Sequence, residues 1–115
     1  MEPILLVLTS VPDREAARRL ADGLVTARLA ACVNVLAECT SVYRWRGAVE
    51  TTSEVPMLIK TRAALFSEVE AFILSHHPYE VPEVIAVPLR GGSLTYLEWL
   101  VQETQPEPPR AVESS

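Results

Sequence analysis

The segment richest in reactive side chains spans residues 76–83 and reads His-His-Pro-Tyr-Glu-Val-Pro-Glu. It holds both histidines of the chain, two carboxylates and one of the three tyrosines. Its two prolines stiffen the backbone, because each fixes φ and removes a hydrogen-bond donor. A rigid connector that carries metal- or proton-binding side chains is typical of a functional loop. The alternative is that His77 and Pro78 simply end a helix.

A metal site is the sharpest chemical hypothesis for this segment. Cys32 and His77 would supply a thiolate and an imidazole, which suit copper or zinc, and Glu80 or Glu83 would add a carboxylate oxygen. The separation of 45 residues between Cys32 and His77 is not a metal-binding motif. Cys32 also follows two alanines, so the alternative is that it is a small buried hydrophobic residue.

Aromatic side chains offer a second kind of site. Tyr43 and Trp45 fall on one face of an expected strand, and Arg44 and Arg46 fall on the other. The aromatic face either packs against a neighbouring subunit or forms one wall of a ligand cleft between subunits.

Two further candidates come later in the chain. Lys60 is the only lysine, and it either neutralises an anionic ligand or forms an ion pair with a carboxylate such as Glu83. Tyr96 and Trp99 lie on an expected C-terminal helix, where aromatic residues usually indicate a core or an interface.

The hydrophobic pattern places these residues on a regular series of elements. We expect a strand over 4–9, a helix from 13 to about 28, a long hairpin over 32–61, a helix over 63–75, a strand over 84–87 and a helix over 94–103, with Ser93 as its cap. This order is the α+β, ferredoxin-like split βαβ pattern with an added C-terminal helix. It predicts a four-stranded antiparallel sheet with two helices on one face. Residues 1–104 are expected to form one domain, followed by a disordered, proline-rich tail over 105–115.

The long hairpin is a physical argument for self-association. Its first strand is expected to show Val33, Val35, Tyr43 and Trp45 on a single face. Strands usually run 3–10 residues, so a hairpin of about 30 residues outreaches a small domain. Its far end then needs another surface to cover it. Pro56 predicts an edge or a bulge in the returning strand.

Composition limits the class of protein. The net charge of −5, with one lysine and nine arginines, argues against binding to nucleic acid or to an anionic membrane. The apolar run over 4–8 is too short for a signal segment or a membrane span. Two cysteines fit a reduced, cytoplasmic protein; on one strand Cys32 and Cys39 would point to opposite faces and cannot bond. No catalytic triad, phosphate loop, CxxC or HExxH motif indicates an enzyme.

Several motifs, taken in order, resemble the CutA family of divalent-cation tolerance proteins. They are Val11-Pro12 and the segments over 27–34, 41–47, 54–61, 77–83 and 96–100. The resemblance implies a ferredoxin-like fold assembled as a homotrimer, with hairpins that extend sheets between subunits, similar to PII signalling proteins. It also implies that Cys32 and His77 are copper ligands. Pro56 departs from the family pattern, where an ordinary strand residue stands.

Two hypotheses follow. The first is a cytoplasmic, non-enzymatic homotrimer that binds copper(II) or another divalent cation through Cys32, His77 and Glu83, without an organic cofactor. The second is a PII-like signalling or adaptor trimer that binds a small organic or anionic ligand in a cleft between subunits. The residues expected to line that cleft are Tyr43, Trp45, Lys60, Tyr79 and Trp99.

Overall fold

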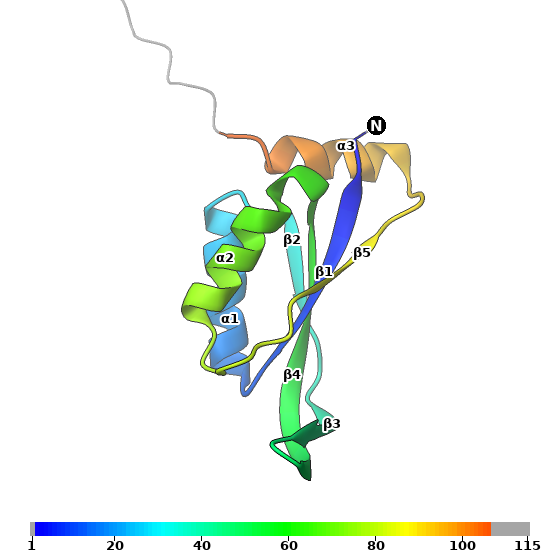
Figure 1. The fold of residues 1–115 in the computed structure, drawn as a ribbon. Helices are drawn as coiled ribbons and strands as arrows, with labels where there is room; N and C mark the ends of the chain where they lie inside the picture. Colours follow the sequence, from blue (N-terminus) through cyan, green and yellow to red (C-terminus); the bar gives the residue numbers. More distant parts are fainter. Residues whose placement is uncertain (1, 107–115) are drawn as a thin grey trace, which may run out of the picture.

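The computed structural model describes residues 2–106 and has the expected α+β architecture, with three α-helices and an antiparallel sheet (Figure 1). Apart from residues 105 and 106, the tail expected to be disordered lies outside the described residues. Within residues 2–106, no helix has the length and apolar character needed to cross a membrane. The elements are β1 Ile4–Val11, α1 Arg14–Thr26, β2 Cys32–Val35, β3 Cys39–Trp45, β4 Ala48–Arg62, the 3₁₀ turn η1 Ala63–Leu65, α2 Phe66–His76, β5 Ile85–Pro88 and α3 Leu94–Glu103.

The sheet is built around β4, the longest strand. Its order is β2-β4-β1-β5, and β3 pairs with β4 beyond the end of β2. All the pairs are antiparallel, and β1 runs beside β4 from Ile4 opposite Arg62 to Val11 opposite Val55. The described sheet has five strands rather than the expected four, because the first strand of the hairpin is divided into β2 and β3.

A β-bulge opposite Pro56 causes this division. β2 ends with Val35 opposite Met57, and β3 begins with Cys39 opposite Glu54, so three residues face two on β4. The Pro56 carbonyl accepts a backbone hydrogen bond from the facing strand at 2.9 Å, but proline has no N–H to return one. The prediction of an edge or a bulge in the returning strand is therefore wrong as to the strand: β4 is continuous and paired on both sides, and the extra residue lies on the strand that faces Pro56. A bulge of this kind bends and twists its strand.

Because of the bulge, residues of β2 and β3 that simple alternation would place on one face of the sheet lie on opposite faces. Residues paired across strands share a face of the sheet. Val33 is opposite Ile59, which is fully buried beneath the helices, whereas Tyr43 is opposite Glu50 on the other face. The expectation that Val33 and Tyr43 share a face is therefore wrong, because one extra residue changes the alternation.

The same register places the two cysteines on one face rather than on opposite faces. Cys32 is opposite Lys60 and Cys39 is opposite Glu54, and these partners are six residues apart on β4. Six residues span about 20 Å of strand, so the thiols cannot meet. Both cysteines are free and half-buried.

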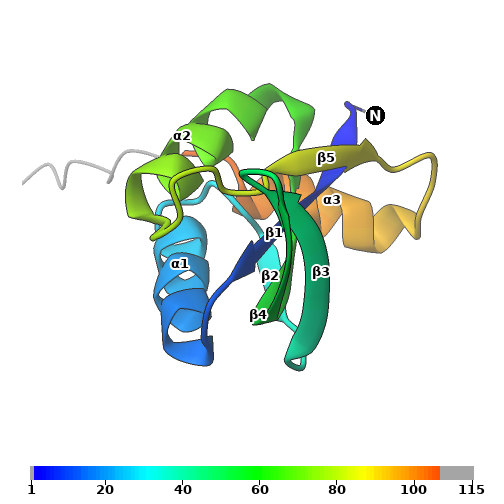
Figure 2. The same cartoon turned by 60° about the horizontal axis from the view of Figure 1, so that its bottom comes forward.

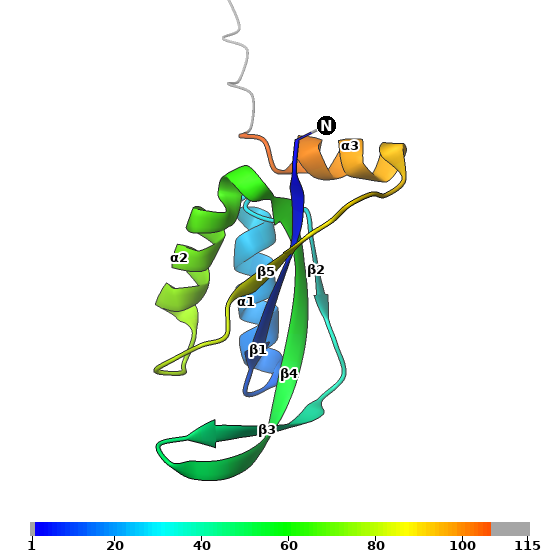
Figure 3. The same ribbon diagram turned by 45° about the vertical axis from the view of Figure 1, so that its right-hand side comes forward.

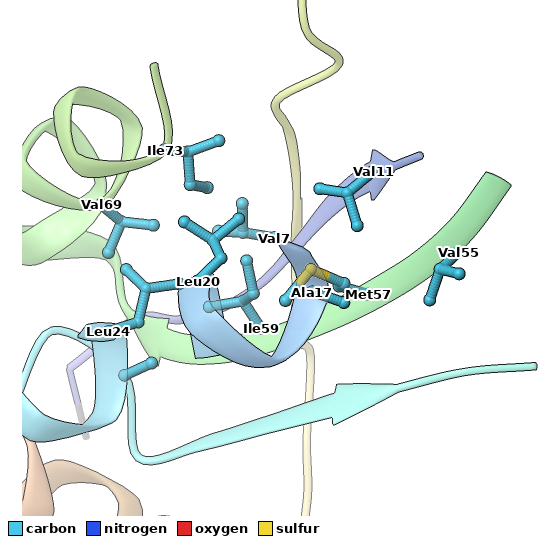
Figure 4. Packing of buried hydrophobic residues seen from close by; sticks show 11 residues of the cluster. Val7, Val11, Ala17, Leu20, Leu24, Val55, Met57, Ile59, Val69 and Ile73 are labelled. Atoms are coloured by element: carbon cyan, nitrogen blue, oxygen red, sulfur yellow. The ribbon is translucent and has the colours of Figure 1, made fainter. Parts of the chain in front are cut away.

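Helices α1 and α2 cover one face of the sheet and form the main core with it (Figure 4). Asp13 caps α1, accepting a hydrogen bond from the Ala16 amide at 2.8 Å, and the helix ends at Thr26 rather than Arg28. A Cβ atom at Gly23 would lie 2.5 Å from the ring of Phe72, so glycine lets α1 and α2 approach closely. The buried residues are Val7, Val11, Ala17, Leu20, Leu24, Ala30, Val55, Met57, Ile59, Val69 and Ile73.

Helix α3 covers one end of the opposite face (Figure 2). Leu100 is buried against Ile4 of β1, whose side chain points away from the main core. Arg62 fastens the end of α3: its Nε donates to the Thr104 hydroxyl at 2.9 Å, and Nη2 donates to the Thr104 carbonyl at 2.7 Å. Ser93 precedes α3 as expected, but its side chain makes no capping hydrogen bond.

Candidate functional site

His77 fastens the loop over 77–83 to the end of β1. It follows α2 with an extended backbone, as expected for a residue before proline. The Tyr79 amide donates to Nδ1 at 3.1 Å, and Nε2 lies 2.7 Å from the Ser10 carbonyl oxygen. A carbonyl oxygen only accepts, so this pattern assigns the proton of a neutral His77 to Nε2. Both ring nitrogens are therefore engaged within the chain.

Tyr79 packs beside this imidazole and faces Glu54 of β4. The ring centroids of His77 and Tyr79 lie 4.8 Å apart. Burial raises the pKa of Tyr79 to about 12, and the hydrogen bond to Glu54 and its negative charge contribute to the rise. The phenol therefore keeps its proton to a higher pH than a free tyrosine, and its hydrogen bond to Glu54 connects the loop to the hairpin.

A cleft of about 730 Å³ opens between this loop and the hairpin. Figure 3 shows why: the β3–β4 hairpin bends beneath the helices, toward the segment that follows α2. The volume is within the range of sites that hold small molecules. Three carboxylates and three aromatic rings line the cleft: Glu54, Glu80, Glu83, Tyr43, Trp45 and Tyr79.

Arg46 sits at the rim of the cleft, where the hairpin tip meets the loop. Arg46 and Gly47 have φ values of 49° and 84°, as expected for a tight two-residue turn. The Arg46 guanidinium donates to the Glu80 carboxylate at 2.8 Å and lies 5.1 Å from the centre of the Trp45 ring. Arg46 was expected on the face opposite Trp45. It covers the Trp45 ring instead, because it lies in the turn rather than in the strand.

The cleft brings together three of the five residues expected to line a ligand site. Tyr43, Trp45 and Tyr79 all line it, with Tyr43 and Trp45 on the hairpin and Tyr79 on the loop. Glu83, the weaker metal candidate, lines the same cleft. One residue of the proposed metal site, Glu83, therefore lies among the residues of the proposed ligand site.

The other two ligand-site candidates, Lys60 and Trp99, lie at the α3 end of the sheet. The Lys60 ammonium is 5.7 Å from the centre of the Tyr96 ring, and Trp99 stacks on Tyr96 at 5.5 Å. The expected ion pair between Lys60 and Glu83 is not formed among the described residues, since Glu83 lies in the cleft. Within one chain, the five residues expected to line a ligand site are therefore divided between the cleft and the α3 end of the sheet.

Cys32 and His77 are not brought together within one chain. Cys32 is opposite Lys60, whereas His77 bonds to Ser10, which is opposite Pro56. These two positions on β4 are four residues apart, which is about 13 Å of strand. Across residues 2–106, no three His, Cys, Asp or Glu side chains are grouped to hold a metal ion. A metal site that uses both residues therefore requires more than one chain.

Glu54, Arg46 and Ser10 take part in the site, although the sequence patterns did not indicate them. For Glu54 a signal exists: the tight turn at the hairpin tip pairs Tyr43 with Glu50, and Glu54, four residues further along β4, shares the face of Glu50. Ser10 contributes only its backbone carbonyl, which no side-chain pattern reveals.

Comparison with known proteins gives a consistent family assignment. Residues 5–103 match the family described as CutA1 divalent ion tolerance protein. The chain is 45% identical over 103 residues to the chloroplastic protein CutA 1 of Oryza sativa subsp. japonica, covering 90% of this chain and 58% of that protein. It is 43% identical over 99 residues to the divalent-cation tolerance protein CutA of Thermus thermophilus, covering 86% of this chain and 96% of that protein.

The fold is also similar to a solved structure of this kind. The crystal structure of CutA1 from Oryza sativa superposes with a TM-score of 0.88 at 43% sequence identity. The match covers 92% of this chain and 97% of that one.

Proposed function

The chain belongs to the family of CutA1 divalent ion tolerance proteins, and from this premise we propose that it acts in divalent-cation tolerance by binding copper or another divalent metal ion. The family match over residues 5–103 carries this proposal. The proposed role is binding rather than catalysis, with the metal ion as cargo. The proposed compartment is the cytoplasm, supported by two free cysteines, although the rice relative is named chloroplastic.

The proposed assembly is a homotrimer, and an uncovered part of the sheet supports it. Between α3 and the cleft, Leu6 and Leu8 of β1 share a face with Val87 and Ile85 of β5. Val87 is 44% exposed and Ile85 is 51% exposed. An apolar sheet face requires a covering layer, and a contiguous exposed patch usually marks an interface. Sedimentation is expected to show a trimer at micromolar concentration, and a stable monomer would contradict the assembly.

The proposed metal ligands are Cys32, His77 and Glu83, contributed by more than one subunit. A thiolate and an imidazole suit copper. In one chain these residues are separated, and His77 can bind a metal only after it gives up one of its two hydrogen bonds. Metal binding is therefore expected to depend on assembly and to loosen the loop that carries His77.

Calorimetric titration with copper(II) tests these ligands. Cys32→Ser and His77→Ala are each expected to weaken copper binding by about tenfold or more. Cys39→Ser and His76→Ala are matched controls, because each removes the same chemical group from outside the proposed site. Unchanged copper affinity in both Cys32→Ser and His77→Ala would exclude the site.

The cleft favours a second candidate function, a PII-like trimeric signalling or adaptor module that binds a small ligand. Tyr43, Trp45 and Tyr79 line a space of about 730 Å³, which suits a small molecule better than a single ion. A ligand that binds only the folded state raises the melting temperature. The absence of any such shift across a broad metabolite panel would argue against this candidate.

A further inference from the structure

We propose that the cleft between the hairpin and the 77–83 loop binds a small organic cation, an alkylguanidinium or alkylammonium compound. The cationic group would be held between aromatic rings and carboxylates. This inference rests on the second candidate function, ligand binding in the cleft, and specifies the chemical class of the ligand.

The charge of the cleft gives the first argument. Glu54, Glu80 and Glu83 line it, and none of the residues that line it is a lysine or an arginine. Arg46 at the rim pairs with Glu80, which leaves the half-buried Glu54, hydrogen-bonded to Tyr79, and the exposed Glu83 without an ion-pair partner among the described residues. A cleft lined by one sign of charge concentrates ligands of the opposite sign. The cleft therefore favours a cation over the anionic ligand considered from the sequence.

The aromatic rings give the second argument. Tyr43, Trp45 and Tyr79 line the same space as the carboxylates. The face of an aromatic ring attracts guanidinium and ammonium groups, and tryptophan does so most strongly. Rings and carboxylates together recognise an organic cation through both its charge and its apolar part.

Arg46 shows this mode of recognition within the chain itself. Its guanidinium lies 5.1 Å from the centre of the Trp45 ring while donating to Glu80 at 2.8 Å. The two side chains of this ion pair are about 70% exposed, so the contact is at the mouth of the cleft rather than deep inside. An incoming cation is therefore expected to compete with Arg46 for Trp45 and Glu80.

The spacing of the carboxylates separates this ligand from a bare metal ion. The described residues contain no group of three carboxylate, imidazole or thiolate side chains placed around one point. The three carboxylates instead surround a volume of about 730 Å³. This arrangement suits a molecule several atoms long.

Fluorescence titration provides a direct test, because Trp45 lines the cleft and Trp99, the other tryptophan, lies on α3. In a Trp99→Phe background, Trp45 is the only tryptophan and reports on the cleft alone. The probes are n-butylguanidinium, the neutral and similarly shaped n-butylurea, and the anion pentanoate. We expect saturable binding of n-butylguanidinium at least about threefold tighter than that of n-butylurea, with no binding of pentanoate.

Matched variants test the residues. Arg46→Gln is expected to tighten n-butylguanidinium binding about threefold, because it removes the competing cation. Arg44→Gln makes the same change of charge on a neighbouring hairpin residue outside the cleft and is expected to leave affinity unchanged. Glu83→Gln is expected to weaken binding about threefold, whereas Glu98→Gln on α3 is expected to have no effect.

These experiments distinguish failure of the cationic-ligand inference from failure of ligand binding in the cleft. Equal affinity for n-butylguanidinium and n-butylurea, or tighter binding of pentanoate, would overturn the cationic ligand and leave a ligand-binding cleft. Weaker or unchanged binding in Arg46→Gln would overturn the competition between Arg46 and the ligand. No saturable response to any of the three probes would overturn the inference together with the cleft function on which it rests.

Discussion

His77 donates a hydrogen bond from Nε2 to the Ser10 carbonyl oxygen at 2.7 Å, across 67 residues of sequence. This contact joins the loop after α2 to the end of β1. The other ring nitrogen accepts from the Tyr79 amide, so the imidazole also fixes the first turn of the loop. The residue with the best metal-binding chemistry in the chain thus holds one wall of the cleft in place.

Replacing His77 with alanine is expected to lower the free energy of unfolding by about 2 kcal/mol, because two hydrogen bonds of a half-buried ring are lost. Urea unfolding at fixed protein concentration measures the change. His76→Ala removes an exposed imidazole from the end of α2 and is expected to cost less. Among the described residues, His76 makes contacts only within its own helix, with Ser75 and Phe72, so an equal loss in the two variants would contradict a larger stabilising role for the long-range contact of His77 with Ser10.

Ionisation of Tyr79 is expected to make the protein less stable in strong base. Folded Tyr79 keeps its proton until its pKa of about 12, whereas an unfolded tyrosine releases it near 10.0. The contribution of the raised Tyr79 pKa to the stability of the fold is therefore complete below about pH 10 and is lost as the pH rises through 12. Ultraviolet titration should show one phenol ionising late, and Glu54→Gln should lower its pKa. Tyr79→Phe should lose less stability than the wild type over this range.

Gly23→Ala is expected to destabilise the protein by about 1–3 kcal/mol, because the new methyl group would overlap the ring of Phe72. Helix propensity alone predicts the opposite, a gain of about 1 kcal/mol. Thermal and urea unfolding distinguish the two signs. The double variant Gly23→Ala/Phe72→Leu should cost less than the sum of the single changes. A more stable Gly23→Ala protein would show that α1 and α2 adjust freely.

Arg62→Lys is expected to cost about 2–3 kcal/mol although it keeps the charge. The Arg62 side chain is only 11% exposed and reaches two oxygen atoms of Thr104 as well as Glu2. A lysine ammonium cannot reproduce this fork of donors. Faster limited proteolysis near α3 should accompany the loss. Arg44→Lys, at an exposed strand position, is the control, and equal stability of the two variants would refute a clamping role for Arg62.

Ile85→Glu is expected to dissociate the proposed trimer, because it puts a charge on the uncovered sheet face. Leu74→Glu is a close control: Leu74 is also 51% exposed in the chain but lies on α2. Sedimentation velocity should show a smaller species for Ile85→Glu and an unchanged one for Leu74→Glu. A trimer that persists in Ile85→Glu would place the interface elsewhere.

The order of the elements was predictable because each has a clear local pattern. The continuous apolar run of β1, the helical spacing of Ala16, Leu20 and Leu24, and the alternation along β4 all depend on neighbouring residues. The faces of β3 were not predictable by counting along the strand. One unpaired residue opposite Pro56 reverses every side chain beyond it relative to the helices.

The candidate site was predictable only in part for a related reason. Tyr43, Trp45 and Tyr79 were identified by residue type, and the structure places all three around one cleft. Lys60 and Trp99 carry equally suitable chemistry, but the register of β4 and the packing of α3 place them at the other end of the sheet. Residue type shows what a side chain can do, whereas long-range pairing decides which side chains meet.

The bulge opposite Pro56 makes the shape of the cleft depend on the number of residues between β2 and β3. The tight turn at Arg46 and Gly47 fixes the pairing of β3 with β4, and the core fixes the pairing of β2 with β4. The residues between β2 and β3 exceed those facing them on β4 by one. A chain shortened by that single residue would keep every cross-strand pair of the hairpin. Without the bulge the arm is expected to bend less, which would move its tip away from the loop that His77 holds.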